Sequence, residues 1–358
     1  MTQQNTIHWL HISDYHEGQK GAKEFWPQVR ARFRDNLKSQ CEENGPLDLV
    51  IFSGDLVFKG DPAEYKAVKE ELIDLWQYFA SLGQNPKLFL VPGNHDLQRP
   101  GESSALSILA QMLRQNPAVK KEIFDDNKSH YRLELLKAFK NYTDFVKDIS
   151  EFIPVLHKNT GKIPGDTSSI FQVNGLSVGI VGLNSAWTHL SKHDLNGKLD
   201  IYVDQLNSVT NDNPPAWLDN NHLNLLVTHH PSSWFHNAAE DEFNSEIDAN
   251  SFFDAHLFGH MHDNLPESHL TPWGTRRKLQ VSSLFGMERF RDNIERKHGY
   301  YFVKVDANSS TWTIWPRIIE KKSGGWDIGR DSSILRGDSF SLETPWNCRK
   351  KLNDSIKK

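Results

Sequence analysis

The segment KLFLVPGNHD, residues 87–96, joins an apolar run to a dense group of polar side chains. Leu88–Val91 has the length and composition of a buried strand, and a Pro-Gly pair then turns the backbone. Asn94, His95 and Asp96 follow directly. A buried strand that ends in an amide, an imidazole and a carboxylate indicates a chemical site at that strand end.

Similar short apolar runs recur and predict buried strands at Ile7–Ile12, Leu49–Phe52, Leu88–Val91, Leu176–Leu183, Leu223–Val227 and Ala255–Phe258. A helix is predicted over Glu24–Glu43. A second helix begins at the capping box of Asp61 and Glu64 and ends near Gly83. Strands and helices alternate through residue 95, which predicts parallel strand pairing with helices on the faces of the sheet. The predicted fold class is therefore α/β.

Two regions depart from this alternation. Residues 98–168 are polar and helix-rich, and we interpret them as a helical insertion that includes a helix over Tyr131–Ile149. The predicted buried face of that helix consists of Leu133, Leu136, Phe139, Tyr142, Val146 and Ile149. Further along, Tyr300–Val305 and Thr311–Trp315 predict a β-hairpin. The expected organisation is one main domain over residues 1–320, followed by a C-terminal extension or linker over residues 321–358.

The composition fits a globular protein of 358 residues with a substantial core, because 37% of the residues are hydrophobic and 24% are charged. The formal net charge of −5 disfavours a global basic field for nucleic-acid binding. Cys41 and Cys348 are the only cysteines, which argues against a disulfide framework and favours a reducing compartment. The N-terminal residues lack the features of a signal peptide, and no apolar stretch approaches the length that spans a bilayer. We therefore expect a cytoplasmic protein without membrane insertion.

Side chains that can bind metals follow five of the predicted strands. They lie in the segments Ser13–His16, Ser53–Asp55, Pro92–Asp96, Thr228–Pro231 and Gly259–His262. Because ligands of open α/β sheets gather at the carboxyl ends of the strands, we expect these loops to converge on one site. Carboxylate, imidazole and amide groups suit Mn, Fe, Zn, Co or Ni better than thiolate-seeking copper.

The number of candidate ligands indicates two metal ions. Seven side chains are available, which is too many for one tetrahedral ion: Asp14, His16, Asp55, Asn94, His229, His260 and His262. Two ions fit if one carboxylate is shared. Dinuclear sites polarise a phosphoryl group and lower the pKa of a bridging water, so that hydroxide is available for attack near neutral pH. The pattern thus predicts metal-dependent phosphoester hydrolysis.

Each motif has a simpler interpretation when it stands alone. Asp-x-His, or Gly-Asp after a strand, is most often a solvated loop or a cap, and a single histidine near an apolar run is usually a structural hydrogen-bonding residue. The Gly-His-x-His pair is a stronger signal, because alternate positions on an extended segment let two imidazoles reach adjacent ions. All five motifs occur here, each behind a predicted buried strand, and chance is a poor explanation of that combination.

Together the motifs resemble the calcineurin-like metallophosphoesterase superfamily, whose pattern is Asp-x-His, Gly-Asp, Gly-Asn-His-Asp, His and Gly-His-x-His. The resemblance spans roughly residues 6–306, with the helical insertion as its main departure. Four stretches are most similar to the class III cyclic nucleotide phosphodiesterase-like branch: SGDLVFKGDPAEY, LNSAW…NGKLD…DQL, LVTHHP and GHMH. This resemblance implies a four-layer fold, in which two mixed sheets are flanked by helices and the dinuclear site lies on loops at the sheet edges.

The resemblance also implies a role for each ligand. Asp14, His16 and His262 are expected to hold one ion, Asn94, His229 and His260 the other, and Asp55 is expected to bridge them. His229 is preferred to His230 because Pro231 completes the family's His-x-Pro pattern. His230 is left open as a residue that faces the substrate.

Two further residues of the GNHD motif are expected to act in catalysis. The resemblance implies that His95 contacts the phosphate or protonates the leaving group, and that Asp96 orients His95. The simpler interpretation of Asp96 is a helix or turn cap. Lys59 lies beside a ligand loop, where an exposed position is the simpler interpretation.

The leading hypothesis is a metallophosphoesterase that hydrolyses a phosphodiester or a phosphomonoester by attack of a metal-bridging hydroxide, with a phosphodiesterase favoured. The natural substrate, nucleotide-like or not, is left open. A DNA or RNA nuclease would use the same ligands, but the acidic balance and the lack of a basic, aromatic-interleaved strip weigh against it. A binding or scaffold subunit is disfavoured by the complete ligand set. The helical insertion is nevertheless a candidate surface for an oligomer or a protein partner.

Overall fold

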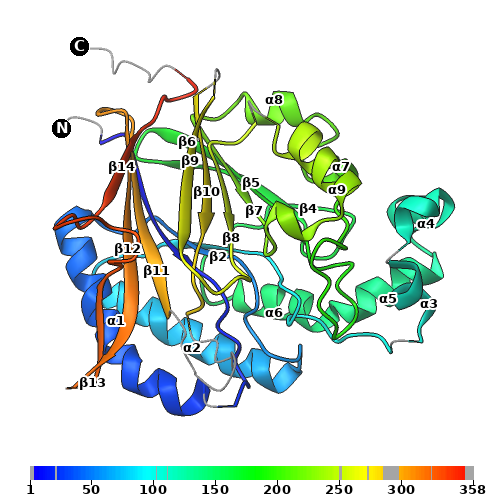
Figure 1. Ribbon diagram of the computed structural model, residues 1–358, viewed down its shortest axis with the longest axis horizontal. Coiled ribbons are helices and arrows are strands. Elements are labelled where there is room, and N and C mark those ends of the chain that lie inside the picture. Colours follow the sequence, from blue (N-terminus) through cyan, green and yellow to red (C-terminus); the bar gives the residue numbers. More distant parts are fainter. Residues whose placement is uncertain are drawn as a thin grey trace.

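The computed structural model describes residues 4–20, 22–101, 103–110, 112–249, 252–271, 274–284, 298–323 and 325–350. In this part of the chain, two seven-stranded mixed sheets lie between layers of helices (Figure 1). One sheet has the strand order β13-β12-β11-β1-β2-β3, with β14 paired to β12. The other has the order β4-β5-β6-β7-β8-β10-β9. The α/β fold with two mixed sheets, expected from the sequence, is confirmed.

The first sheet consists of β1 (Thr6–Ile12), β2 (Leu49–Phe52), β3 (Lys87–Leu90), β11 (His298–Asp306), β12 (Thr311–Lys322), β13 (Gly325–Arg330) and β14 (Leu342–Pro345). β1, β2 and β3 pair in parallel, as predicted, and β11 and β12 form the predicted antiparallel hairpin. β13 and β14 also pair with β12. The described residues beyond residue 320 therefore add strands to this sheet, while a domain boundary at residue 320 stays a prediction.

The second sheet consists of β4 (Asn159–Thr160), β5 (Thr167–Val173), β6 (Leu176–Gly182), β7 (Leu223–Val227), β8 (Ala255–Phe258), β9 (Leu265–Thr271) and β10 (Gly274–Gln280). β6, β7 and β8 match three predicted apolar runs and pair in parallel. The sequence patterns did not indicate β9 and β10. β9 is an edge strand that contains Pro266 and several polar residues, so it lacks the apolar run that marks a buried strand.

Most helices cover the outer faces of the two sheets, and a smaller group lies at one end of the molecule. The helices are α1 (Ala22–Asn44), α2 (Pro62–Ser81), α3 (Ala105–Ala110), η1 (Leu113–Gln115), α4 (Pro117–Asp125), α5 (His130–Ala138), α6 (Lys140–Ile149), α7 (Val203–Val209), α8 (Pro214–Leu218), η2 (Ser232–Trp234), α9 (Asn237–Glu242) and η3 (Phe243–Ile247). The capping box of Asp61 and Glu64 is present at the start of α2, as predicted. No helix among the described residues is both long and apolar enough to cross a membrane.

Three apolar clusters hold the layers together. α1 and α2 pack on the first sheet through side chains such as Phe33 and Phe79. The two sheets meet through residues such as Trp9 and Phe89. A third cluster, which includes Leu206, joins the outer helices to the second sheet. Burying apolar surface on both faces of each sheet supplies the main favourable free energy of such a layered fold.

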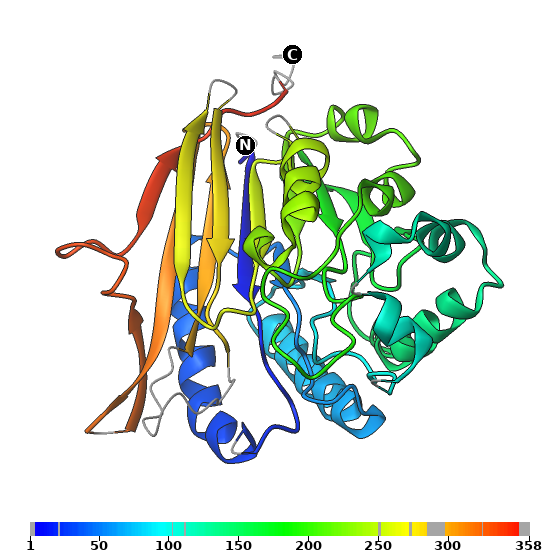
Figure 2. The same cartoon turned by 45° about the vertical axis from the view of Figure 1, so that its right-hand side comes forward.

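The predicted helical insertion divides into two parts. α3, α4 and α5 lie at the end of the molecule opposite β13 (Figures 1 and 2) and share a core with Trp187 and Tyr202. α6 instead packs against α2, where the rings of Tyr65 and Phe145 stack with centroids 5.1 Å apart. The outer helical layer of the first sheet therefore includes α6.

The single helix predicted over residues 131–149 is wrong, because the chain forms α5 and α6 with a break at Phe139. Leu133 and Leu136 of the predicted buried face are 51% and 40% exposed. The break changes the direction of the chain, so that α5 buries Leu135 and Ala138 instead. A continuous 3.6-residue periodicity assumes one helix axis, and that condition fails here.

Candidate metal centre

The five loops that carry the predicted ligands meet at one place, between the ends of β1, β2 and β3 and the ends of β7 and β8. Contacts between the two sheets join them directly. The His229 ring nitrogen Nδ1 lies 2.8 Å from the carbonyl oxygen of Ser53. The backbone N–H of His260 donates to Oδ2 of Asp14 at 3.0 Å. Residues almost 250 positions apart in the sequence are thus held in one site.

Asp14, His16 and His262 form one compact group of potential ligand atoms. Nε2 of His262 lies 3.1 Å from Oδ1 of Asp14, and Nε2 of His16 lies 3.6 Å from the same oxygen. The two imidazole nitrogens are 3.4 Å apart. This is the set that the sequence assigned to one ion, and the structure brings its three members together.

Asp55 and His229 form the centre of a second group, which shares Asp14 with the first. Oδ2 of Asp55 lies 3.2 Å from Nε2 of His229 and 3.7 Å from Nε2 of His16. The Asp55 carboxylate therefore stands between the two ligand sets, where a bridging ligand belongs. His260 joins this side of the site, since its Nδ1 is 3.2 Å from Nε2 of His229.

The amide oxygen of Asn94 completes the predicted set. Oδ1 of Asn94 is buried and has no hydrogen-bond partner among the described residues. A buried amide oxygen without a partner is costly in free energy, unless a ligand outside the chain satisfies it. The same residue lines the cleft beside His16, Asp55 and His260. An oxygen donor in this position fits a metal ion.

The backbone of the site is held in a sparsely populated conformation. Asp14, His16, Asp55, His260 and His262 all have positive φ angles, between 52° and 67°. Non-glycine residues seldom adopt this region, and such strain gathers at functional sites. Five of the seven predicted ligands share it, so the loops bend sharply at the points where their side chains enter the site.

Close backbone approach also shapes the centre. A Cβ atom on Gly93 would lie 2.1 Å from Oδ1 of Asp55, and one on Gly259 would lie 2.5 Å from Oδ2 of Asp14. Only glycine leaves room for the two carboxylates at these positions. The glycines of the Gly-Asn-His-Asp and Gly-His-x-His motifs thus have a steric role as well as a turn-forming one.

The charges in the centre are strongly coupled. Burial alone would raise the pKa of Asp14, but the neighbouring imidazoles of His262 and His16 hold it well below its ordinary value. Burial would lower the pKa of His229, but the Asp55 carboxylate raises it to about 9. Buried carboxylates here require positive charge close by. Divalent metal ions would supply that charge, and the donor set of carboxylate, imidazole and amide suits two of them.

His95 faces the same centre but is oriented by a group that the sequence did not indicate. Its Nδ1 lies 2.8 Å from the carbonyl oxygen of Phe58, and its ring stacks on the Phe58 ring at a centroid distance of 5.1 Å. The ligand atoms of His16, Asp55 and His95 also form a compact group. The remaining nitrogen of His95, Nε2, is therefore the one available at the cleft.

Asp96 occupies a position that differs from the expected one. Its Oδ2 accepts a hydrogen bond from the backbone N–H of Gly93 at 2.8 Å, and its Oδ1 accepts one from Val57 at 3.2 Å. No hydrogen bond to His95 is found within the described part of the chain. The expectation that Asp96 orients His95 is corrected: Asp96 caps the GNHD turn, and Phe58 holds the imidazole.

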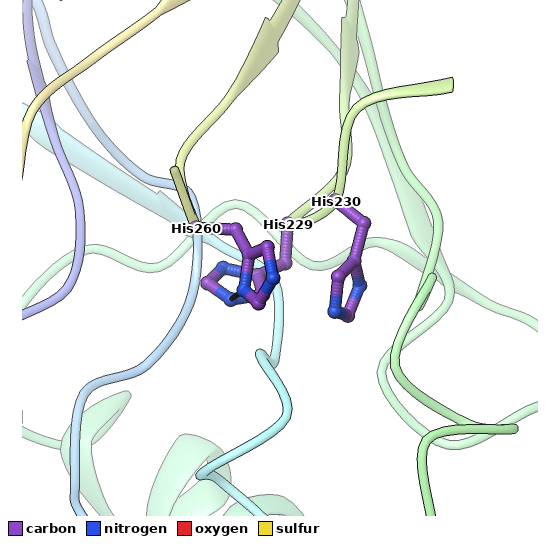
Figure 3. A group of neighbouring side chains, drawn as sticks. All are labelled: His229, His230 and His260. Carbon is purple, nitrogen blue, oxygen red and sulfur yellow. Dashed lines mark hydrogen bonds between the residues drawn. The ribbon is translucent and has the colours of Figure 1, made fainter. Parts of the chain in front are cut away.

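His230 forms a compact group of potential ligand atoms with His229 and His260 (Figure 3). Its ring centroid is 4.4 Å from that of His260, and its Nδ1 is 3.0 Å from Oγ of Ser185. On the other side, Nε2 of His230 lies 3.3 Å from Nδ1 of His189. The His230 side chain is fully buried, so it contacts other protein groups and not the open cleft. Figure 3 shows His229 and His260 next to each other, with His230 at their side.

Ser185 and His189 are site residues that sequence reasoning missed. The Ser185 hydroxyl oxygen accepts hydrogen bonds from the backbone N–H groups of His229 and His230, at 3.2 and 2.9 Å. His189 lines the cleft. Both follow β6, another parallel strand, so the position of the segment NSAWTH at a strand end was the available signal.

The candidate centre opens into a cleft of about 1950 Å³. His95, Arg99, the exposed Lys59 and the aromatic side chains of Phe58 and Trp234 line the cleft. Five of the predicted ligands line it too: His16, Asp55, Asn94, His260 and His262. A cleft of this size can admit a substrate considerably larger than a phosphate group. The cationic and aromatic side chains suit an organic phosphoester, and the acidic residues Asp194, Asp263 and Glu320 line the cleft as well.

Comparison with known protein families gives one match: a family described as calcineurin-like phosphoesterase matches residues 7–264. The matched region begins in β1 and ends just after the loop that follows β8, so it contains every predicted ligand. A comparison with curated protein sequences gives no match.

Several solved structures are similar to this chain. A Vps29 variant from Entamoeba histolytica is 12% identical, with a TM-score of 0.36, and the match covers 91% of this chain and 98% of that one. A purple acid phosphatase from yellow lupin is 11% identical, with a TM-score of 0.45, over 96% of this chain and 54% of that one. The sulfate thiohydrolase SoxB from Thermus thermophilus is 13% identical, with a TM-score of 0.39, over 84% of this chain and 53% of that one.

Proposed function

Because the chain belongs to the calcineurin-like phosphoesterase family, we propose that it hydrolyses a phosphoester with the help of two divalent or transition-metal ions bound in the candidate centre. The observation that carries the proposal is the convergence of seven donor side chains, from five strand ends, beside a cleft of about 1950 Å³. Phosphodiesters are the favoured substrates, and phosphomonoesters remain within the proposal. The metal-binding and catalytic roles of the individual residues are part of it.

Three side chains would hold one ion and three the other: Asp14, His16 and His262 on one side, and Asn94, His229 and His260 on the other, with Asp55 shared. When bound, two such ions would polarise a phosphoryl oxygen and lower the pKa of a water molecule. The chain itself orients the donors. For example, the contact between Nδ1 of His229 and the Ser53 carbonyl presents Nε2 of His229 to the centre.

His95 would act on the substrate. Since Nδ1 of His95 is hydrogen-bonded to the Phe58 carbonyl, Nε2 is directed to the phosphate or to the leaving-group oxygen. In hydrolysis, the oxygen of water forms a bond to phosphorus, the ester P–O bond breaks, and the leaving alcohol gains a proton. Asp96 contributes by holding the turn that carries Asn94 and His95.

The first test compares three variants of the full chain by metal analysis and by hydrolysis of bis-(p-nitrophenyl) phosphate with added Mn²⁺. Asp55→Ala is expected to lose both bound metal and activity, because it removes the shared carboxylate. His95→Ala is expected to keep most of the metal while turnover falls by roughly 100-fold, which is typical for the loss of a general acid or base. His130→Ala, an exposed histidine on α5, serves as the control and should match the unmodified protein.

The proposal fails if the unmodified protein binds two metal ions per chain and hydrolyses no phosphoester. It also fails if the protein binds no metal under any loading condition. If His95→Ala abolishes metal binding while the fold is intact, His95 is a ligand and the division of roles is wrong.

The nuclease alternative makes a separate prediction. A nuclease would cleave single- or double-stranded DNA at moderate salt in competition with small diesters. The formal net charge of −5 gives no general attraction to polyanions, so we expect small phosphoesters to be the better substrates.

The complete donor set supports catalysis over a purely scaffolding role.

A further inference from the structure

Beside the candidate centre, the cleft carries cationic side chains that the proposed chemistry does not use. Lys59, Arg99 and Lys192 line the cleft, as do His95 and His189. None of these three cations forms an ion pair with a carboxylate within the described ranges. Lys59 and Lys192 are exposed, whereas Arg99 is half-buried. Arg99 therefore differs from an ordinary surface cation.

The Arg99 side chain is held in place by the loop of the metal ligands. Its Nη2 donates a hydrogen bond to the carbonyl oxygen of Asn94 at 2.5 Å. Its Nε is buried without a hydrogen-bond partner in the described part of the chain. One nitrogen of the guanidinium group thus fixes its position, and the group retains unused donor capacity next to the centre.

Arg99 lines the same cleft as His95 and His189. Burial lowers the pKa of Arg99, and the charge of the Asp55 carboxylate acts in the opposite direction. Asp55 already contacts His229 and His16, at 3.2 and 3.7 Å.

A half-buried guanidinium without a carboxylate partner is unfavourable, because arginine stays protonated and loses hydration on burial. An anion bound in the cleft would satisfy it. The planar guanidinium fork matches the oxygen atoms of a phosphate group better than the point charge of lysine does.

We propose that Arg99 is a substrate-binding residue, which holds an anionic phosphate oxygen of the substrate beside the metal centre. The inference rests on the proposed phosphoesterase function. It adds to that function a specificity-determining residue outside the set of metal ligands. The phosphate oxygen belongs either to the scissile group or to a second phosphate of a larger substrate. Both sources have the same chemistry, and the experiment separates them.

A purely structural role for Arg99 would have a different signature. If Arg99 only supported the Asn94 carbonyl, its loss would reduce metal content or thermal stability and leave the affinity for phosphate unchanged. The binding test therefore measures metal content, melting temperature and phosphate affinity on the same samples.

In the binding test, inorganic phosphate is titrated calorimetrically into the full chain loaded with Mn²⁺. Arg99→Met is expected to weaken phosphate binding by about 10- to 100-fold, the usual effect of losing a charged hydrogen bond, while the metal content is retained. Arg99→Lys should lie between Arg99→Met and the unmodified protein. Lys321→Met removes an exposed cation of β12 that lines the same cleft, and should change the affinity by less than twofold.

Two chromogenic diesters show whether Arg99 binds the scissile phosphate or a second phosphate of the substrate. They are p-nitrophenyl thymidine 5′-phosphate and the same compound with an added 3′-phosphate. An equal fall in kcat/KM for both in Arg99→Met assigns Arg99 to the scissile phosphate. A fall for the 3′-phosphorylated compound alone assigns it to a second phosphate. Either result supports the proposal.

Unchanged phosphate affinity and unchanged kcat/KM for both compounds in metal-loaded Arg99→Met would overturn it. So would loss of metal from both Arg99→Met and Arg99→Lys, because that result identifies a structural role. If the unmodified protein hydrolyses nothing, the proposed function fails, but the calorimetric comparison still decides whether Arg99 binds phosphate.

Discussion

Asp166 is a buried carboxyl group next to, but outside, the candidate centre. Its Oδ1 accepts hydrogen bonds from the backbone N–H of Asn184 at 2.7 Å and from Nε2 of Gln205 at 3.0 Å. Its Oδ2 is buried without a partner among the residues that the structure describes. Burial raises the pKa of Asp166 from 3.8 to about 8, although these hydrogen bonds act in the opposite direction.

This shift predicts a pH-dependent contribution to stability. An acid whose pKa is higher in the folded state contributes stability below its unfolded pKa, and that contribution is lost as the pH rises through the folded value. Between about pH 4 and 8, the free energy of unfolding should therefore fall relative to Asp166→Asn, by at most about 1.4 kcal/mol per pH unit. Above that range the difference should be constant.

The measurement is urea-induced unfolding of both proteins at several values between pH 5 and 9. Comparing the two proteins removes the contribution of the histidines, which are the same in both. Asn retains the acceptor oxygen and cannot ionise, so parallel stability profiles would contradict the assignment of a raised pKa to Asp166.

At the scale of elements, the insertion helices are fastened to the main fold by Arg114 of η1. Its Nε and Nη1 donate to Oδ1 of Asp200 and Oε2 of Glu242, both at 2.7 Å, and Nη2 donates to the carbonyl oxygen of Ile201 at 2.9 Å. The guanidinium also lies over the Tyr202 ring. A single side chain thus connects η1 with the loop before α7 and with α9.

Loss of the Arg114 contacts should lower the stability of the protein. Arg114→Met is expected to lower the free energy of unfolding by about 2 kcal/mol or more, because it leaves the buried Asp200 carboxylate with His236 as its remaining ion-pair partner in the described chain. Lys140→Met breaks an exposed i,i+4 pair with Asp144 and serves as the control, with an expected change below about 0.5 kcal/mol. Equal effects of the two substitutions in urea-induced unfolding would show that Arg114 has no anchoring role.

At the scale of the whole molecule, the candidate centre joins the two sheets. Its ligands follow β1, β2 and β3 on one side and β7 and β8 on the other, with both carboxylates on the first side and three imidazoles on the second. A ligand that binds the folded state and not the unfolded one stabilises the fold by mass action. Metal ions bound here would therefore hold the sheets together.

Removal of metal by a chelator is accordingly expected to lower the melting temperature, and Mn²⁺ in excess should restore it. A stabilisation of about 3 kcal/mol corresponds to free metal at roughly 100 times its dissociation constant. Asp55→Ala, which should not bind metal, is the control. A melting temperature that responds to the chelator equally in both proteins would exclude the centre as the source of the effect.

The strands and the identities of the candidate ligands could be predicted from sequence because both signals are local. Leu88–Val91 is apolar over a continuous stretch, and Asn94 follows it within a few residues. The same relation holds after β1, β2, β7 and β8. Helix direction was less predictable, as the break at Phe139 shows, because packing against α2 and against Trp187 decides where α5 ends and α6 begins.

The sequence by itself determined the α/β order, the family and the side chains available for metal binding. Only the tertiary structure decided how those side chains are supported. Phe58 orients His95 over a separation of 37 residues, and Ser185 supports His230 over 45. Asp96 caps a turn, and Arg99 is left without a carboxylate partner within the described residues. These contacts depend on which loops the packed sheets bring together. A local pattern of residues carries no information about contacts between segments that are far apart in the sequence.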